Sequence, residues 1–380
     1  FNWRSGYDAG DARVRIAKGR KLTIACKYKA SCDKGEPAGV RAYKGNGEKD
    51  IWYGGDWAFY AENEIPGPLQ NFFGNMETDR AGGFGQGDIQ LASGSILRSV
   101  AAADWTLTQP VYTKTWPSRT GKSGAIEVAG AGVWTLAGDV TTQNSGGTST
   151  ITFQGDGEGV VDGVVSNGTG TCVLAIVKSG SGTWTLTQPC AFTGATTVNA
   201  GTLKVAASGS LASSSRLNLK GGTLCFVGGE TSVVTQELKR IDVSVASSTL
   251  KLSGKVVVNA LDFAAETGFV LDIVTDDPAA KLNVPTDKET VKAVKFTWNG
   301  QPVVIAADGE VKMNADAVIA ARGDIVPDNG GHVAIFFDGT SGNNTLAADT
   351  TTLMKLTQMS KTAATVEVGE GQTLLTPSVA

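Results

Sequence analysis

The residues Thr183-Trp184-Thr185-Leu186-Thr187-Gln188-Pro189 decide the fold. Trp184 and Leu186 alternate with threonines, which is the period-two pattern of a strand with one buried face. Six of these residues recur without change as Trp105-Thr106-Leu107-Thr108-Gln109-Pro110, and Trp134-Thr135-Leu136 is a shorter copy. The repeats are 29 and 50 residues apart, so we expect a repeated structural unit that carries insertions.

The following stretch, Thr197 to Val205, alternates on both sides of a glycine. Val198 and Ala200 share one face before Gly201, and Leu203 and Val205 share one face after it. A glycine at such a phase shift favours a corner or bulge, where a positive φ is needed. The sequence therefore predicts short strands that are joined at glycine corners.

Short strands at this spacing also occur in antiparallel sandwiches and barrels. Asn-Gly and Asp-Gly pairs are the strongest signals of tight hairpins, and none lies between residues 170 and 298. Hairpins stay open as alternatives at residues 155–168 and after residue 299. A repeated unit also needs neighbours to cover its apolar face, which stacking supplies. We therefore predict an all-β chain that is mainly a β-solenoid.

Residues 177–187 and 192–205 resemble the autotransporter-associated β-strand repeat. That pattern is roughly K-x-G-x-G-T-hydrophobic-T-L-T-G, followed by Y-T-G-G-T-T-hydrophobic-N-x-G-T-L. Here Gln188-Pro189, Phe192 and Ala195 depart from it. The resemblance implies a right-handed parallel β-helix in a secreted protein of the bacterial cell surface. It implies no catalysis and brings no catalytic residues.

Composition divides the chain into three predicted parts. Residues 1–90 carry local charge and many aromatics, and we predict an N-terminal cap or a small aromatic-rich domain there. Glycine, threonine, serine, alanine and valine dominate later, so residues 91–348 are predicted to form the solenoid. Residues 349–380 are predicted to be its C-terminal end or an exchange strand.

The bulk composition excludes some partners. The net charge of −4 gives no basic surface for nucleic acid. No apolar run reaches the length of about 18 residues that suggests a membrane-spanning helix.

We predict a non-enzymatic extracellular structural or adhesive protein without cofactors. Self-association into a filament or layer, or binding to other cell-surface components, is the expected interaction. The alternative is a β-helix protein that binds or cleaves polysaccharides.

The aromatic stretch provides the candidate ligand contacts, since flat rings stack on sugars and exposed aromatics mark contact surfaces. The alternative interpretation is that these rings fill the core of a cap, because a solenoid needs its open end covered. The candidates are Trp52, Tyr53, Trp57 and Tyr60.

Catalytic and metal chemistry finds little support. His332 is the only histidine, and no GxSxG motif is present. Asp156, Glu158 and Asp162 alternate, but their spacing fits no known calcium loop, so we interpret them as an acidic turn. Cys26 and Cys32 are close enough in sequence to close a disulfide loop in an oxidising compartment. The other cysteines, predicted to be buried small hydrophobes, are Cys172, Cys190 and Cys225.

Overall fold

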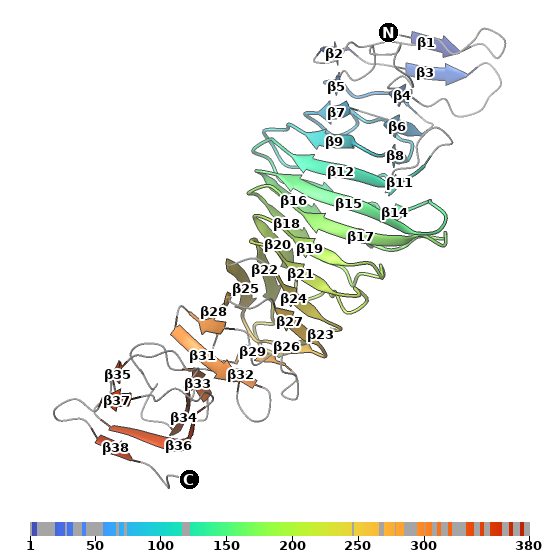
Figure 1. The fold of residues 1–380 in the computed structure, drawn as a ribbon. Coiled ribbons are helices and arrows are strands. Elements are labelled where there is room, and N and C mark those ends of the chain that lie inside the picture. Colours follow the sequence, from blue (N-terminus) through green and yellow to red (C-terminus); the bar gives the residue numbers. More distant parts are fainter. Residues whose placement is uncertain are drawn as a thin grey trace. The chain divides into compact units, whose positions relative to one another are not determined.

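A computed structural model of the chain shows β-strands and no helix in the residues that it describes (Figure 1). These residues are 2–5, 20–26, 29–32, 40–42, 56–65, 68–71, 74–115, 122–244, 247–265, 270–277, 279–284, 295–299, 301–305, 310–312, 318–320, 332–337, 343–345, 350–358, 365–367 and 373–375. The chain divides into two compact units, one of residues 1–218 with 222–224, the other of residues 219–221 with 225–380.

The first unit is built on a sheet in which each strand pairs in parallel with the next one. Figure 1 shows these strands stacked one after another, from blue to green. Such a stack of parallel strands from successive turns confirms the predicted β-solenoid, of about 8 turns in all. In order, this first sheet contains β2 (Lys21–Ile24), β5 (Asp56–Phe59), β7 (Gly74–Thr78), β9 (Ser95–Ser99), β12 (Ser123–Val128), β15 (Thr148–Gly155), β17 (Val173–Lys178) and β19 (Thr196–Val198).

Two further parallel sheets complete the coils of the first unit. The second sheet contains β10 (Trp105–Leu107), β13 (Trp134–Leu136), β16 (Glu158–Val161), β18 (Thr183–Leu186) and β20 (Thr202–Val205). The third contains β4 (Val40–Ala42), β6 (Leu69–Asn71), β8 (Ile89–Leu91), β11 (Val111–Thr113) and β14 (Val140–Thr142). A separate parallel pair joins β1 (Asn2–Ser5) to β3 (Lys29–Cys32).

The tryptophan repeats stack directly in register along the second sheet. Trp105 lies opposite Trp134, Trp134 opposite Gly159, and Gly159 opposite Trp184. The 50-residue spacing is therefore two coils of 25 residues, and Gly159 occupies the tryptophan position of the intervening coil. The 50-residue spacing therefore needs no insertion, because one of its two coils simply lacks the tryptophan, whereas the coil from Trp105 to Trp134 is longer, at 29 residues.

The core lies between the sheets and follows the predicted alternation. Trp184 and Leu186 are buried in β18, and Leu203 and Val205 are buried in β20. Gly201 has a φ of 61°, so the phase shift is the predicted glycine corner. Aromatic rings run through this core in contact with one another, with centroids 4.8–6.5 Å apart: Trp57, Phe59, Phe84, Trp105, Trp134, Phe153 and Trp184.

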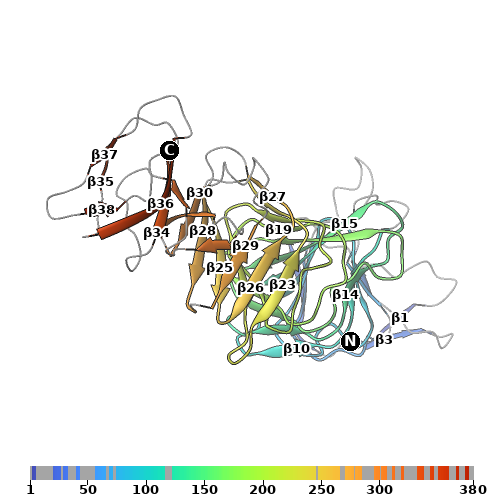
Figure 2. The same ribbon diagram turned by 90° about the horizontal axis from the view of Figure 1, so that it is seen from below.

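The second unit also begins with parallel strands. Figure 2 shows β23, β26 and β29 side by side. Its parallel groups are β23 (Val234–Leu238), β26 (Val256–Ala260) and β29 (Lys281–Asn283); β24 (Ile241–Val243) and β27 (Phe263–Ala265); and β25 (Ser247–Ser253), β28 (Val270–Thr275) and β30 (Lys295–Trp298). The strands at the junction of the two units are β21 (Leu217–Leu219) and β22 (Thr223–Val227).

Antiparallel pairing interrupts this stack. β31 (Gln301–Ile305) pairs antiparallel with β30, and β32 (Glu310–Lys312) pairs antiparallel with both β31 and β29. Asn299 turns the chain between β30 and β31 with a φ of 50°, so the hairpin left open after residue 299 is present. The hairpin left open at 155–168 is absent, because β15 and β16 each pair in parallel within different sheets.

Parallel pairing resumes in the last part of the chain. One sheet contains β33 (Val318–Ala320), β34 (His332–Phe337), β36 (Thr350–Gln358) and β38 (Thr373–Leu375). β35 (Asn343–Thr345) pairs in parallel with β37 (Thr365–Glu367). The 349–380 segment therefore contributes strands that pair within the chain.

The predicted boundaries at residues 90 and 348 stay predictions. The strands β5 to β8 begin before residue 90, and they already belong to the first and third sheets. The cap was predicted over residues 1–90, and much of its first part, residues 1–55, lies outside the described residues.

Candidate functional site

Three charged side chains and one neutral amide line up on the outer face of the first sheet. Glu77 in β7, Arg98 in β9, Glu127 in β12 and Gln154 in β15 are direct register partners on four successive strands. Because side chains alternate across a strand, these four lie on the face opposite the buried residues that precede them, which are Met76, Leu97, Ile126 and Phe153. We call this row the outer ladder.

Ion pairs and hydrogen bonds connect neighbouring members of the outer ladder. Arg98 Nε lies 2.7 Å from Glu127 Oε1, and Arg98 Nη1 lies 3.7 Å from Glu77 Oε2. Gln154 Nε2 donates to Glu127 Oε2 at 2.7 Å. Negative, positive and negative charges thus alternate along the stack, which avoids the repulsion that like charges in direct register would cause.

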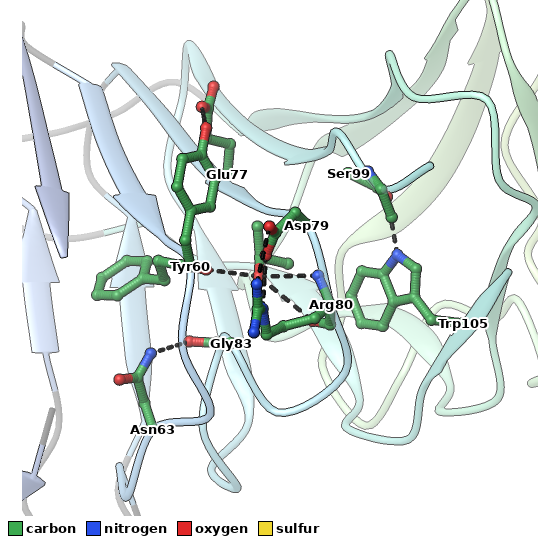
Figure 3. A network of polar contacts seen from close by, with 11 residues as sticks. Tyr60, Asn63, Glu77, Asp79, Arg80, Gly83, Ser99 and Trp105 are labelled. Carbon is green, nitrogen blue, oxygen red and sulfur yellow. Dashed lines mark hydrogen bonds and ion pairs between the residues drawn. The ribbon is translucent and has the colours of Figure 1, made fainter. Parts of the chain in front are cut away.

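Glu77 is the most buried charged side chain of the outer ladder, and it accepts hydrogen bonds from two further side chains. Lys21 Nζ donates to Glu77 Oε1 at 2.7 Å, and the Tyr60 hydroxyl donates to the same oxygen (Figure 3). The Glu77 side chain is only 2% exposed, whereas Lys21 is 43% exposed. With Arg98, side chains from four successive coils therefore meet at one carboxylate.

The pKa shifts follow from these contacts. Burial raises the pKa of Glu77, but hydrogen bonds from Lys21 and Tyr60 outweigh it, and the net pKa lies below the ordinary value of 4.5. The hydrogen bond to Glu77 raises the pKa of Tyr60 to about 12. At neutral pH, Glu77 is therefore an ionised acceptor and Tyr60 a neutral donor, a pairing that holds coils together and leaves no neutral carboxylic acid there to donate a proton.

Two further polar contacts lie near this site, one within a coil and one between neighbouring coils. Figure 3 shows Trp105 beside Ser99 and Asn63 beside Gly83. The Trp105 indole donates to Ser99 Oγ at 2.8 Å, and the Asn63 amide donates to the Gly83 carbonyl at 2.6 Å. The Asp79–Arg80 pair, at 2.7 Å, lies between neighbours in sequence and is more exposed.

The predicted ligand contacts occupy different environments. Trp57 is 8% exposed and stacks on Phe59 at 5.9 Å, within the aromatic core. Tyr60 is half-buried and bound to Glu77. Trp52 and Tyr53 lie outside the described residues. Ligand binding by these four residues stays a prediction, and only Tyr60 joins the outer ladder.

The alternating acids of the 156–162 segment are separated by the fold. Asp156 accepts a hydrogen bond from Ser181 Oγ at 2.7 Å, and Asp162 accepts one from Thr187 Oγ1 at 2.6 Å. Each donor lies 25 residues later, on the following coil. Among the residues described, no group of three or more His, Cys, Asp or Glu side chains could hold a metal ion.

The cysteines and the histidine add no assembled site. Cys26 is an exposed free thiol, so the disulfide loop suggested by its spacing from Cys32 is not formed. His332 begins β34, and its side chain is outside the described set. The three later cysteines are buried as predicted: Cys172, Cys190 and Cys225.

Sequence reasoning missed the outer ladder. Its members are 21, 29 and 27 residues apart, so no single period connects them. The available signal is local: Met76-Glu77-Thr78, Leu97-Arg98-Ser99 and Ile126-Glu127-Val128 each place one charge at the outer position of a strand.

The comparisons with known proteins agree with this architecture. Residues 176–205 match the model of the passenger-associated-transport-repeat. No curated protein and no solved structure matches the chain significantly. In the part of the chain that the structure describes, no helix is long and apolar enough to cross a membrane. The matched repeat, set in a parallel β-solenoid, fits an autotransporter passenger-type repeat protein.

Proposed function

We propose that this chain is the non-enzymatic structural or adhesive portion of an exported bacterial surface protein. The observation that carries the proposal is the passenger-type repeat at residues 176–205, which coincides with β18 to β20 and the end of β17 in the parallel stack. The repeat family implies export to the cell surface or secretion. Stacked coils provide a stiff scaffold without any catalytic group.

The charge arrangement supports a scaffold more than a polysaccharide-cleaving site. Glycosidases need two carboxyl groups, one of them protonated, on either side of a bound sugar. In the outer ladder Glu77 and Glu127 both pair with Arg98, and the pKa of Glu77 is lowered. These carboxylates thus act between coils of the protein itself.

Self-association is the proposed mode of action, and strand edges are its natural route. The edges of β29 and β30 are already occupied, because the hairpin β31–β32 pairs with both strands. β38 is the terminal strand of its sheet, next to β36. We therefore assign self-association to the segment 349–380, which contains β36, β37 and β38.

The experiment compares the full chain with a 349–380 deletion by light scattering and negative-stain microscopy. The full chain is expected to form fibres or layers, and the deletion to remain as single particles. Far-UV circular dichroism verifies that the deletion keeps its β-sheet content. A second variant, Leu374→Lys, places a charge in β38 and should weaken association without removing the segment. Equal scattering from all three proteins would contradict this proposal.

A glycan array distinguishes an adhesive role toward sugars. Trp52→Ala is the suitable variant, because Trp57 is buried and its loss would disturb the aromatic core. Glycan binding that Trp52→Ala removes would assign adhesion to the aromatic stretch. Release of reducing ends from a polysaccharide would instead establish the cleaving enzyme and overturn the proposed function.

A further inference from the structure

Lys178 occupies a core position of the matched repeat. It ends β17, where its register partners are Phe153 on the preceding strand and Val198 on the following one. Phe153 is fully buried and Val198 is 1% exposed, and the Lys178 side chain is itself fully buried. A lysine is almost never fully buried without partners, so this position needs an explanation.

Three main-chain carbonyl oxygens surround the Lys178 amino group. Nζ donates to Ser179 O at 2.7 Å, to Gly180 O at 2.8 Å and to Ala200 O at 3.2 Å. We call these three oxygens the corner carbonyl site. An ammonium group has three donors and no acceptor, so its hydrogen-bonding capacity matches the three oxygens. Two of the oxygens belong to the corner after β17, and the third belongs to the next coil.

Glycine backbone geometry forms this corner. Gly180 and Gly201 have φ values of 72° and 61°, in the left-handed region. A Cβ atom on Gly201 would lie 2.7 Å from Lys178 Nζ and 2.3 Å from Gly180 O. Among the described residues, no backbone N–H donates to the three oxygens, so Lys178 is the donor that satisfies them.

The charge on Lys178 is consistent with this occupancy. Burial lowers the pKa of Lys178 to about 8, while the charge of Asp156 opposes the shift. At neutral pH the group is therefore still mostly an ammonium ion.

We propose that the corner carbonyl site is a binding site for a primary ammonium group, which the chain fills with its own Lys178 and so fastens the 176–186 coil to the next. Lys122 provides a natural comparison. Its Nζ also donates to two corner carbonyls of a later coil, Ser145 O at 2.8 Å and Gly146 O, but Lys122 is half-exposed. Water can replace Lys122, whereas the buried Lys178 has no such substitute.

The experiment measures thermal unfolding of the full chain and three variants at pH 7. Lys178→Met keeps an unbranched side chain that is one heavy atom shorter, and it removes the donors. Its Tm should fall by several degrees, and that of Lys122→Met should barely change. Lys178→Ala opens space for a small ammonium ion, and propylammonium chloride should raise its Tm more than tetramethylammonium chloride at equal ionic strength. Neither salt should change the Tm difference between wild type and Lys178→Met, because both side chains fill the site.

The choice of salts isolates the N–H donors, because tetramethylammonium carries the charge but cannot donate a hydrogen bond. If Lys178→Ala is unfolded at room temperature, recovery of its β-sheet circular dichroism in propylammonium replaces the Tm reading. A Lys178→Met protein as stable as wild type would overturn the proposal. Equal effects of the two salts on Lys178→Ala would also overturn it.

Discussion

A Cβ atom on Gly159 would lie 2.4 Å from Cε3 of Trp184, its register partner on the next coil. The indole of Trp184 thus covers the space that a side chain at residue 159 would need. Its ring also contacts Trp134, at 6.5 Å between centroids, on the far side of the intervening coil. The missing side chain at Gly159 is therefore what brings two tryptophans from non-adjacent coils together.

Gly159→Ala is expected to destabilise the protein by about 1–3 kcal/mol, because overpacking a filled core forces neighbouring rings to move. Urea unfolding at 25 °C measures the loss. Trp184→Leu removes the ring that the new methyl group meets. The double variant Gly159→Ala/Trp184→Leu should then lose less stability than the two single changes added together. Strict additivity would show that the Gly159–Trp184 contact is not the cause.

A second prediction concerns Trp134, whose Nε1 is buried and has no hydrogen-bond partner among the residues that the structure describes. In the preceding coil, the Trp105 indole donates to Ser99, which lies six residues before it. Val128 is the register partner of Ser99 on the next strand, and it lies six residues before Trp134. Val128→Thr should supply the missing acceptor. We expect it to be less destabilising than Val140→Thr, at another fully buried valine, by about 1 kcal/mol. Equal losses in urea unfolding would argue against this pairing.

Local patterns predicted the strands and corners well. The alternation in Thr183–Thr187 identified Trp184 and Leu186 as buried, and the phase shift at Gly201 identified a corner with positive φ. Both features depend on residues within a few positions of each other. The parallel stacking also followed, because hairpin signals are missing where the strand pattern is clearest.

The cross-coil contacts could not be predicted in the same way. Glu77 meets Arg98, and Arg98 meets Glu127, only because coils of different length bring them into register. The contacts of Lys178 were not predicted either, since its partners are main-chain carbonyls and the sequence does not show where a corner points them. Side-chain patterns predict which face a residue occupies, whereas coil length decides its neighbours.

The third prediction tests the outer ladder. Glu77→Gln removes a carboxylate that accepts from Lys21 and Tyr60, and hydrogen bonds to charged groups contribute about 1.5–3 kcal/mol each. We expect a loss of about 1–3 kcal/mol at pH 7 by urea unfolding. The control is Asp79→Asn, which breaks the more exposed pair with Arg80 and should change stability by about 0.5 kcal/mol or less.

The same variant has a defined pH dependence. The folded-state pKa of Glu77 is lowered, so its contribution is present above the unfolded-state value and disappears as pH falls through the folded-state value. The stability difference between wild type and Glu77→Gln should therefore shrink as the pH drops below about 4. A difference that stays constant down to pH 2 would mean that the charge of Glu77 is not what stabilises the ladder.

The last prediction follows from Lys178. Its pKa is lowered from 10.5 to about 8 in the folded protein, so between these values the unfolded chain binds a proton that the folded chain does not. Stability should therefore rise with pH in this window, in contrast to the usual behaviour of a lysine that gains a carboxylate partner. Because other lysines and tyrosines also titrate here, the quantity to measure is the difference between wild type and Lys178→Met from pH 7 to 10.5. That difference should move in favour of wild type as pH rises. A flat profile would show that folding leaves the proton affinity of Lys178 unchanged.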